Sequence, residues 1–271
     1  MLAVIPARGG SKGVPGKNLA EVAGVPLVGR AVRAALAAPT VTDVVVSTDS
    51  DAVADAARAA GADALRRPAA LAGDGASSES AVLHALESFE ELHSVTVDVV
   101  LLVQCTSPFL TASDVEGVAA AVAGGAADSA LTVAPFHGFL WRAPDRRALE
   151  QRAPDRRAPD QRAPEQVAAA GDVTGVNHDP AVRPRRQDRP QDLLETGAAY
   201  AMDAVGFRAA RHRFFGRVLP VPTDPSRVLE VDDPHDLARA RALAPLLDEP
   251  PPPRTRKRTR TRTRTEGRHL T

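Results

Sequence analysis

The segment best suited to chemistry is a glycine-rich, cationic loop that follows the first apolar run of the chain. Residues 7–18, ARGGSKGVPGKN, contain four glycines together with Arg8, Lys12 and Lys17. Glycine lets backbone N–H groups approach an anion closely, and the three cations supply positive charge. This combination suits a triphosphate. An ordinary glycine-rich turn with solvated lysines is the alternative that the loop alone leaves open.

The loop does not match the standard phosphate-binding motifs. The spacing of a Walker A loop before Gly16-Lys17 requires glycine where this chain has Ser11. Asn18 also replaces the Ser or Thr that would hold magnesium, and no G-x-G-x-x-G occurs here.

An acidic pair near the C-terminus is the second candidate. In Glu230-Val231-Asp232, alternation along a strand would point both carboxylates to one face, where they could share a divalent cation. Asp236 could add a contact to that site or cap a helix that begins near Pro234, and we favour the cap.

These residues need a scaffold, and the chain alternates β-branched runs with amphipathic stretches. The strand-like runs are residues 2–5, 43–47, 97–103, 129–133 and 197–202. Helical spacing of apolar residues is found over 27–36, 53–60, 82–89, 115–122 and 234–247. Nearly continuous apolar strands suit a sheet covered on both faces, so we predict an α/β fold with a doubly wound, mostly parallel sheet. Ligands in this architecture bind beyond the carboxyl ends of the strands.

Length and composition narrow the class of protein. The 271 residues can bury one substantial core. The 34 basic and 34 acidic residues balance, but residues 254–271 are strongly basic, so the remainder is acidic and no specific nucleic-acid partner is indicated. A single cysteine, no signal-like segment and no apolar run long enough for a bilayer predict a cytoplasmic protein without a membrane span.

Two segments have the composition of disordered chain. Residues 142–165 repeat a Pro- and Arg-rich unit such as RAPDRR, and residues 249–271 form a basic Arg-Thr tail. We therefore expect a nucleotide-binding core over residues 1–135 and a separate lobe over 136–200 that contains the insert. Residues 201–248 would return to the core with the acidic motif.

Six further motifs follow the loop in a consistent order. They are VVVSTDSD (44–51), RRPAALAGDGASSESAVLHALE (66–87), LLVQCTSPFLT (101–111), RPRRQD (183–188), ETGAAY (195–200) and LEVDDPHDL (229–237). Together with the loop they resemble the acylneuraminate cytidylyltransferases, also called CMP-N-acetylneuraminic acid or CMP-sialic acid synthetases. The CMP-Kdo synthetases are more distant. The resemblance covers roughly residues 1–245, interrupted by the insert.

This resemblance implies a Rossmann-like fold of the nucleotide-diphospho-sugar transferase type and a homodimeric assembly. It also implies that the small lobe over residues 136–200 serves sugar-acid binding and dimerisation. It implies transfer of CMP from CTP to the anomeric hydroxyl of an N-acylneuraminate, a nine-carbon sialic-type acid, with release of pyrophosphate. A nucleotidyltransferase of the same fold that acts on Kdo, a legionaminic-type acid or a secondary-metabolite precursor is the alternative. A noncatalytic polyanion-binding protein is a more remote one.

The resemblance also implies roles for individual residues. The CTP phosphates would be held by Arg8, Ser11, Lys12 and Lys17, and the cytosine and ribose by Asn18, Arg67 and Ser78. The sugar acid would be bound by Gln104, Arg186, Gln187 and Tyr200. Mg²⁺ or Mn²⁺ would be held by Asp232 and Glu230, and catalysis would depend on Arg8, Lys17 and Asp232.

Three positions depart from the usual pattern of the family. Glu230 is one methylene longer than the usual aspartate, which changes metal geometry at that position. Cys105 and Leu110 replace a proline and an arginine, and a thiol on a buried strand end is expected to be inert packing. The RPRRQD motif also fits a surface basic patch or a dimer contact.

Overall fold

The computed structural model describes residues 1–73, 75–143 and 173–248. Most of the insert predicted at 142–165, and the tail predicted at 249–271, lie outside these residues. Within the described part, no helix is long and apolar enough to cross a membrane.

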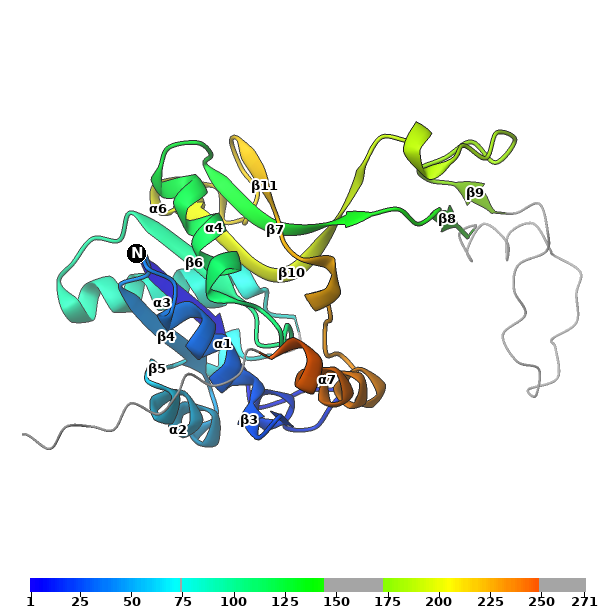
Figure 1. Ribbon diagram of the computed structural model, residues 1–271. Coiled ribbons are helices and arrows are strands. Elements are labelled where there is room, and N and C mark those ends of the chain that lie inside the picture. Colours follow the sequence, from blue (N-terminus) through cyan, green and yellow to red (C-terminus); the bar gives the residue numbers. More distant parts are fainter. Residues whose placement is uncertain (74, 144–172, 249–271) are drawn as a thin grey trace, which may run out of the picture.

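A seven-stranded sheet forms the centre of the molecule (Figure 1). The strands are β1 (Leu2–Pro6), β4 (Asp43–Thr48), β5 (Asp63–Arg66), β6 (Val99–Val103), β7 (Ser129–Phe136), β10 (Asp192–Asp203) and β11 (Val218–Pro222). Their order is β11-β7-β10-β6-β1-β4-β5, and β10 runs antiparallel to both of its neighbours while the other pairs are parallel. The predicted mostly parallel α/β sheet is confirmed.

The two edge strands, β5 and β11, are absent from the sequence prediction. β5 has only four residues and none of them is fully buried, so its apolar signal is weak. β11 contains Pro220 and Pro222, which interrupt a strand pattern. An edge strand tolerates proline because one of its sides needs no N–H donors.

Helices cover both faces of this sheet. They are α1 (Leu27–Leu36), α2 (Asp51–Ala60), α3 (Ser78–His93), α4 (Ala112–Ala123), α6 (Ala204–Ala210) and α7 (Pro234–Leu247). Alternation along β1 separates the two layers. Ala3 and Ile5 join the apolar cluster formed with α1, α2, α4 and α7, whereas Leu2 and Val4 join the cluster formed with α3 and α6.

Side-chain caps fix where the helices begin after the loops at the carboxyl edge of the sheet. The capping side chains of α2, α3 and α4 are Ser50, Ser77 and Thr111. Helix α7 has the predicted bounds, but its N-cap is Asp233. Asp236 completes the capping box by accepting the Asp233 N–H at 3.3 Å, so it takes part in the cap as its second carboxylate.

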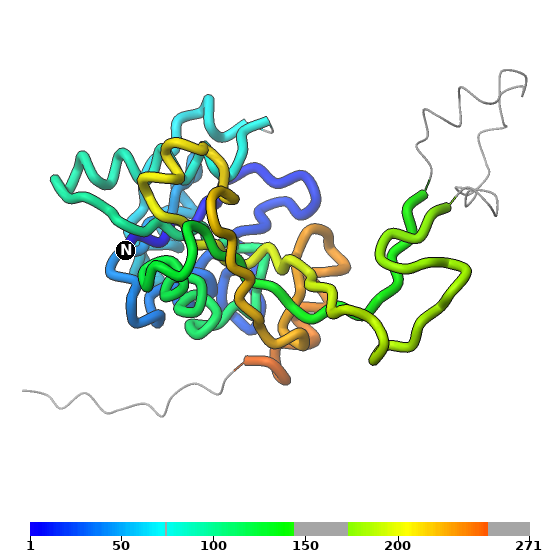
Figure 2. The backbone as a smooth tube through the Cα atoms, turned by 90° about the horizontal axis from the view of Figure 1, so that it is seen from above, coloured from blue at the N-terminus to red at the C-terminus, as the bar shows by residue number. Residues whose placement is uncertain are grey.

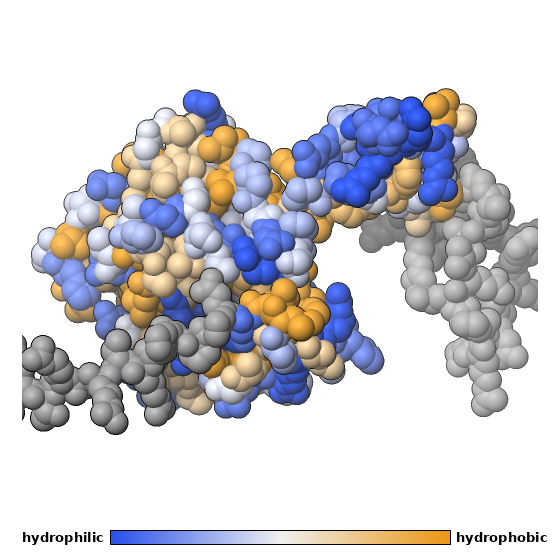
Figure 3. Space-filling model, viewed as in Figure 1, coloured by the Kyte–Doolittle hydropathy of each residue, from blue (hydrophilic) through white to orange (hydrophobic). Residues whose placement is uncertain are grey.

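A long arm leaves the body of the molecule where β7 and β10 continue past the core (Figures 1 and 2). Its far part contains β8 (Trp141–Arg142), β9 (Thr174–Gly175) and η3 (Arg186–Asp188). Exposed apolar side chains along it are Leu140, Trp141, Val176, Val182, Leu193 and Leu194. Figure 3 shows open space between the arm and α7. The apolar side chains of the arm are therefore not covered by the body of the same chain.

The remaining short elements lie close to the sheet. They are η1 (Lys17–Leu19), β2 (Glu21–Val22), β3 (Val25–Pro26), η2 (Ala69–Leu71) and η4 (Pro225–Arg227). The first three continue directly from the glycine-rich loop into α1, and α7 packs beside β2.

Candidate active site

The glycine-rich loop and the acidic pair meet beyond the carboxyl end of β1. Lys17, at the start of η1, donates from Nζ to Asp232 Oδ1 at 3.0 Å. A Cβ at Gly13 would overlap the carbonyl oxygen of Asp232, so the loop backbone lies directly against the acidic segment. Lys17 and Asp232, to which the resemblance assigns a role in catalysis, therefore lie side by side in the fold.

Local contacts hold the loop in a folded-back shape. Asn18 donates from Nδ2 to the carbonyl oxygen of Arg8 at 2.9 Å, which closes the loop on itself. Gly16 has φ 64°, in the left-handed region that glycine adopts without strain. Ser11 and Lys12 lie on the same loop, where Ser11 is partly buried and Lys12 is exposed.

An aspartate that the sequence analysis did not single out anchors this loop. Asp49, just after β4, accepts the backbone N–H of Gly9 through Oδ1 at 2.8 Å. A Cβ at Gly9 would come 2.9 Å from the Cβ of Ser50, so glycine is required for this close approach. Two signals in the sequence point to Asp49: it follows a predicted strand, where functional side chains collect, and it lies within the VVVSTDSD motif.

Arg67 is buried beside this anchor. It is 6% exposed, and it donates from Nε to Ser47 Oγ at 3.1 Å and from Nη2 to the Ser47 carbonyl oxygen at 2.5 Å. Burial lowers the pKa of Arg67, the charge of Asp49 opposes that shift, and the charge of Arg8 adds to it. The negative charge of Asp49 therefore stabilises the charged form of Arg67.

The acidic segment is held by the loop after β6. The backbone N–H of Val231 donates to the carbonyl oxygen of Thr106 at 2.8 Å, and the Thr106 hydroxyl donates to Glu230 Oε1 at 3.4 Å. Residues 229–233 belong to no strand of the sheet, contrary to the sequence prediction. The alternation nevertheless holds, since Val231 is buried while Glu230 and Asp232 are exposed.

The carboxylate of Asp232 affects the pKa of Glu230. Burial, and then the negative charge of Asp232, raise the pKa of Glu230. Gly197, in the irregular part of β10, has φ 71°, and a Cβ there would lie 3.0 Å from Glu230 Oε1. Glu230 is thus confined between this glycine and Thr106.

This donor set fits a hard divalent cation. Among the described residues there is no group of three or more His, Cys, Asp or Glu side chains that could hold a metal ion. Magnesium needs fewer protein ligands than that, because it commonly binds one or two protein carboxylates together with substrate phosphates. Two neighbouring carboxylates, one with a raised pKa, beside a cationic loop have that character.

Two further predicted residues lie at the same edge of the sheet. Ser78 is the first residue of α3, and Gln104 follows β6 directly, with its backbone N–H donating to the Ala198 carbonyl oxygen at 3.0 Å. Cys105 is 3% exposed, and burial raises the pKa of its thiol to about 12. The thiol is thus protonated at neutral pH, as the packing interpretation requires.

The residues predicted to bind the sugar acid are not brought together within one chain. Arg186 and Gln187 lie in η3 on the arm, where they line an open hollow with His137, Arg189 and Gln191. Tyr200 is buried in the cluster beneath α3, and its hydroxyl donates to Glu195 Oε1 at 2.5 Å.

The fold and this site define a nucleotidyltransferase class, in which a cationic loop and an acidic pair share one edge of a mostly parallel sheet. A family model described as "Cytidylyltransferase" matches residues 2–139. The chain belongs to the cytidylyltransferase family.

Known relatives agree with this assignment. N-acylneuraminate cytidylyltransferase A of Danio rerio is 34% identical over 200 residues, which are 73% of this chain and 40% of the relative. CMP-N,N'-diacetyllegionaminic acid synthase of Legionella pneumophila is 44% identical over 110 residues, 40% of this chain and 47% of that protein. The chain thus spans less than half the length of each of these relatives.

The fold is shared with a solved CMP:2-keto-3-deoxy-manno-octonic acid synthetase complexed with CTP. The TM-score is 0.60 at 20% sequence identity, and the alignment covers 90% of this chain and 98% of that one. At this identity the similarity establishes the fold.

Proposed function

We propose that this chain transfers CMP from CTP to the anomeric hydroxyl of an N-acylneuraminate and releases pyrophosphate. The observation that carries the proposal is the contact between Lys17 and Asp232, because it puts the phosphate-binding loop and the acidic pair at one place. The family assignment and the name of the Danio rerio relative support the choice of nucleotide and acceptor.

The loop accounts for the triphosphate. Its backbone N–H groups, with Arg8, Lys12 and Lys17, would neutralise phosphate oxygens as charge develops on them. The new bond forms between the anomeric oxygen and the α-phosphorus, the bond to the β-phosphate oxygen breaks, and the hydroxyl proton leaves to solvent.

The acidic pair would bind the metal ion that the reaction uses. Asp232 and Glu230 would hold Mg²⁺ or Mn²⁺, which when bound supplies charge neutralisation on the phosphates. Lys17 would then lie between the metal ligand Asp232 and the phosphates, where its charge can serve either.

In a homodimer, the arm would supply the residues that bind the sugar acid. Arg186 offers a planar guanidinium that can bind a carboxylate through two parallel hydrogen bonds. It lies on an arm with uncovered apolar side chains, and a second copy of the chain would cover them. We propose that each arm completes the sugar-acid site with its partner. We also propose a cytoplasmic location, since the one cysteine is a buried thiol.

A direct test is release of pyrophosphate from CTP and N-acetylneuraminate, with and without Mg²⁺. Kdo and legionaminic-type acids, each offered with four nucleoside triphosphates, separate this function from the same-fold alternatives that the relatives' names suggest. No turnover with any nine-carbon acid would overturn the proposal. Deleting residues 250–271 separates a polyanion-binding tail from catalysis, which should be unchanged.

A further inference from the structure

A small cavity lies behind the acidic pair, between the loop after β6 and the segment that leads to Glu230. Its walls include Ser107, Thr132, Thr196, Arg227 and Leu229. It leaves about 20 Å³ open to the centre of a water molecule. Space of this kind holds a single water when polar groups line it.

Two polar atoms in this region are buried without a hydrogen-bond partner in the described part of the protein. They are Ser107 Oγ, on a residue that is 7% exposed, and Arg227 Nε. A buried polar group without a hydrogen-bond partner destabilises the fold, because it has lost its bonds to water without replacing them. Two such atoms around one small cavity therefore indicate a ligand that bonds to both.

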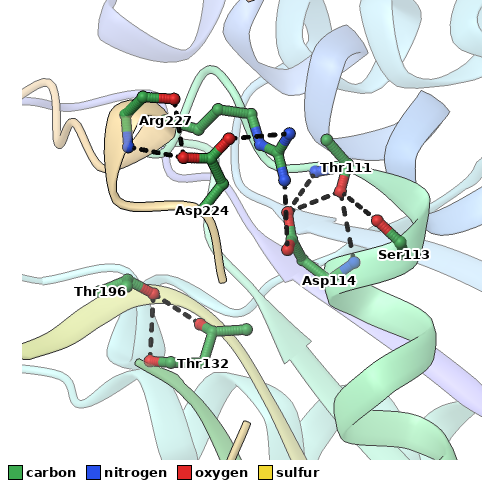
Figure 4. Close-up of polar contacts among 8 residues, drawn as sticks. Thr111, Ser113, Asp114, Thr132, Thr196, Asp224 and Arg227 are labelled. Carbon is green, nitrogen blue, oxygen red and sulfur yellow. Dashed lines mark hydrogen bonds and ion pairs between the residues drawn. The ribbon is translucent and has the colours of Figure 1, made fainter. Parts of the chain in front are cut away.

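Other groups nearby already have partners. The hydroxyls of Thr132 and Thr196 lie 2.6 Å apart, and Thr196 Oγ1 also lies 3.1 Å from the carbonyl oxygen of Thr132 (Figure 4). Thr132 Oγ1 lies 3.2 Å from the carbonyl oxygen of Ala199. Asp114 accepts from the Thr111 hydroxyl at 2.6 Å as part of the cap of α4. The polar atoms of Thr132, Thr196 and Asp114 thus bond to one another, to Thr111 or to the backbone, and none of them bonds to Ser107 Oγ or Arg227 Nε.

The guanidinium of Arg227 is only loosely paired. It lies 3.8 Å from Asp114 Oδ1 and 3.7 Å from Asp224 Oδ2, longer than direct hydrogen bonds (Figure 4). Two carboxylates against one cation make the surroundings net negative, which disfavours an anion. The size and charge of the cavity both favour a neutral water.

We propose that the cavity binds one ordered water, which accepts from Arg227 Nε and donates to Ser107 Oγ, and that this water positions the acidic pair. Ser107 follows Thr106, which holds Val231 and Glu230. Arg227 lies at the end of η4, and the buried Leu229 that lines the cavity directly precedes Glu230. The water thus joins the two segments that fix the acidic pair, and its positioning role rests on the proposed metal-binding function.

The test combines a crystal structure with a binding measurement that needs no turnover. Ordered density within hydrogen-bond distance of both atoms is expected in the wild-type cavity. Binding of Mn²⁺, followed by electron paramagnetic resonance of the free ion, should weaken about tenfold in Ser107→Ala, at the low end of the effect of residues that orient metal ligands. Arg227→Lys, which retains charge but cannot reproduce Nε, should show the same loss.

Ser113→Ala is the matched control, because it removes an exposed hydroxyl near the start of α4 that does not line the cavity. It should bind Mn²⁺ as wild type does, and thermal unfolding without metal identifies any variant that fails to fold. A dry cavity, or unchanged Mn²⁺ binding in both cavity variants, would overturn the inference. Absence of Mn²⁺ binding by the wild type would instead overturn the metal role in the proposed function and the positioning role with it, while the density still decides whether the water is bound.

Discussion

Lys17 and Asp232 are separated by 215 positions in the chain, yet Lys17 Nζ lies 3.0 Å from Asp232 Oδ1. The lysine side chain is 15% exposed and the aspartate side chain 67% exposed. The ion pair therefore lies at the surface, where the carboxylate of Asp232 is open to solvent.

Replacing Asp232 should remove activity with little effect on stability. An exposed ion pair contributes about 0–1 kcal/mol to folding. Loss of a group that stabilises transition-state charge lowers kcat by about 100-fold or more. We expect both results for Asp232→Asn, measured as pyrophosphate release and as thermal unfolding. Near-normal turnover would show that the acidic pair lies outside the reaction.

Asp49 should control CTP affinity through the loop. Asp49→Ala removes both the charge and the acceptor for the Gly9 N–H, a charged hydrogen bond of about 1.5–3 kcal/mol. We expect calorimetry to show CTP binding weakened by about ten- to a hundredfold. Asp49→Asn, which retains an acceptor oxygen, should lose less.

The control for Asp49 is Asp55→Asn, on an exposed carboxylate of α2 that pairs with Arg58 at 3.0 Å. It should bind CTP as the wild type does. Equal CTP affinity in Asp49→Ala and Asp55→Asn would show that the loop holds its shape without the anchor.

Replacing Gly197 should have two effects, because the new side chain would strain the backbone and would also press on Glu230. Gly197→Ala and Gly125→Ala both put a side chain where φ is near 70°, which costs about 1–2 kcal/mol of stability. Only at position 197 would the new Cβ press on Glu230, since nothing lies within 4 Å of it at Gly125. We expect similar losses in chemical denaturation, but weaker Mn²⁺ binding in Gly197→Ala alone.

Cys105 should show the pH dependence of a buried thiol. Its pKa is about 12 in the folded protein against an ordinary 9.0. Because the folded value is raised, the thiol's contribution is fully present below pH 9.0 and is lost as the pH rises toward about 12. The stability difference between wild type and Cys105→Ala should therefore shrink between pH 8 and pH 10.5 in urea titrations.

A thiol reagent provides the second measurement for Cys105. Ellman's reagent should react slowly with the native protein at pH 8 and rapidly after unfolding. Fast reaction in the native state would contradict the inert role.

The proposed exchange of arms predicts complementation between inactive variants. Lys17→Ala and Arg186→Ala would each damage a different half of a shared site. Random mixing gives heterodimers with one intact site, so activity should recover to about a quarter of wild type. Subunits mixed without an exchange step serve as the control, and no recovery after confirmed exchange would contradict the shared site.

The sheet, and the position of the glycine-rich loop at its edge, could be predicted from local patterns in the sequence. Long apolar strands such as residues 97–103 and cap residues before helices are local signals, so the parallel core and the bounds of α7 could be predicted. The position of the glycine-rich, cationic loop directly after the first strand was also predictable, because it follows from a local pattern of residue types.

Contacts between residues from distant segments of the chain could not be predicted in this way. The contact of Lys17 with Asp232, the anchor from Asp49 to Gly9 and the confinement of Glu230 by Gly197 join parts of the chain that no local pattern connects. The edge strands β5 and β11 likewise depend on pairing with a neighbour rather than on their own composition. The physical reason is that propensity and periodicity act over a few residues, whereas these contacts are fixed by the packing of the whole sheet with its helices.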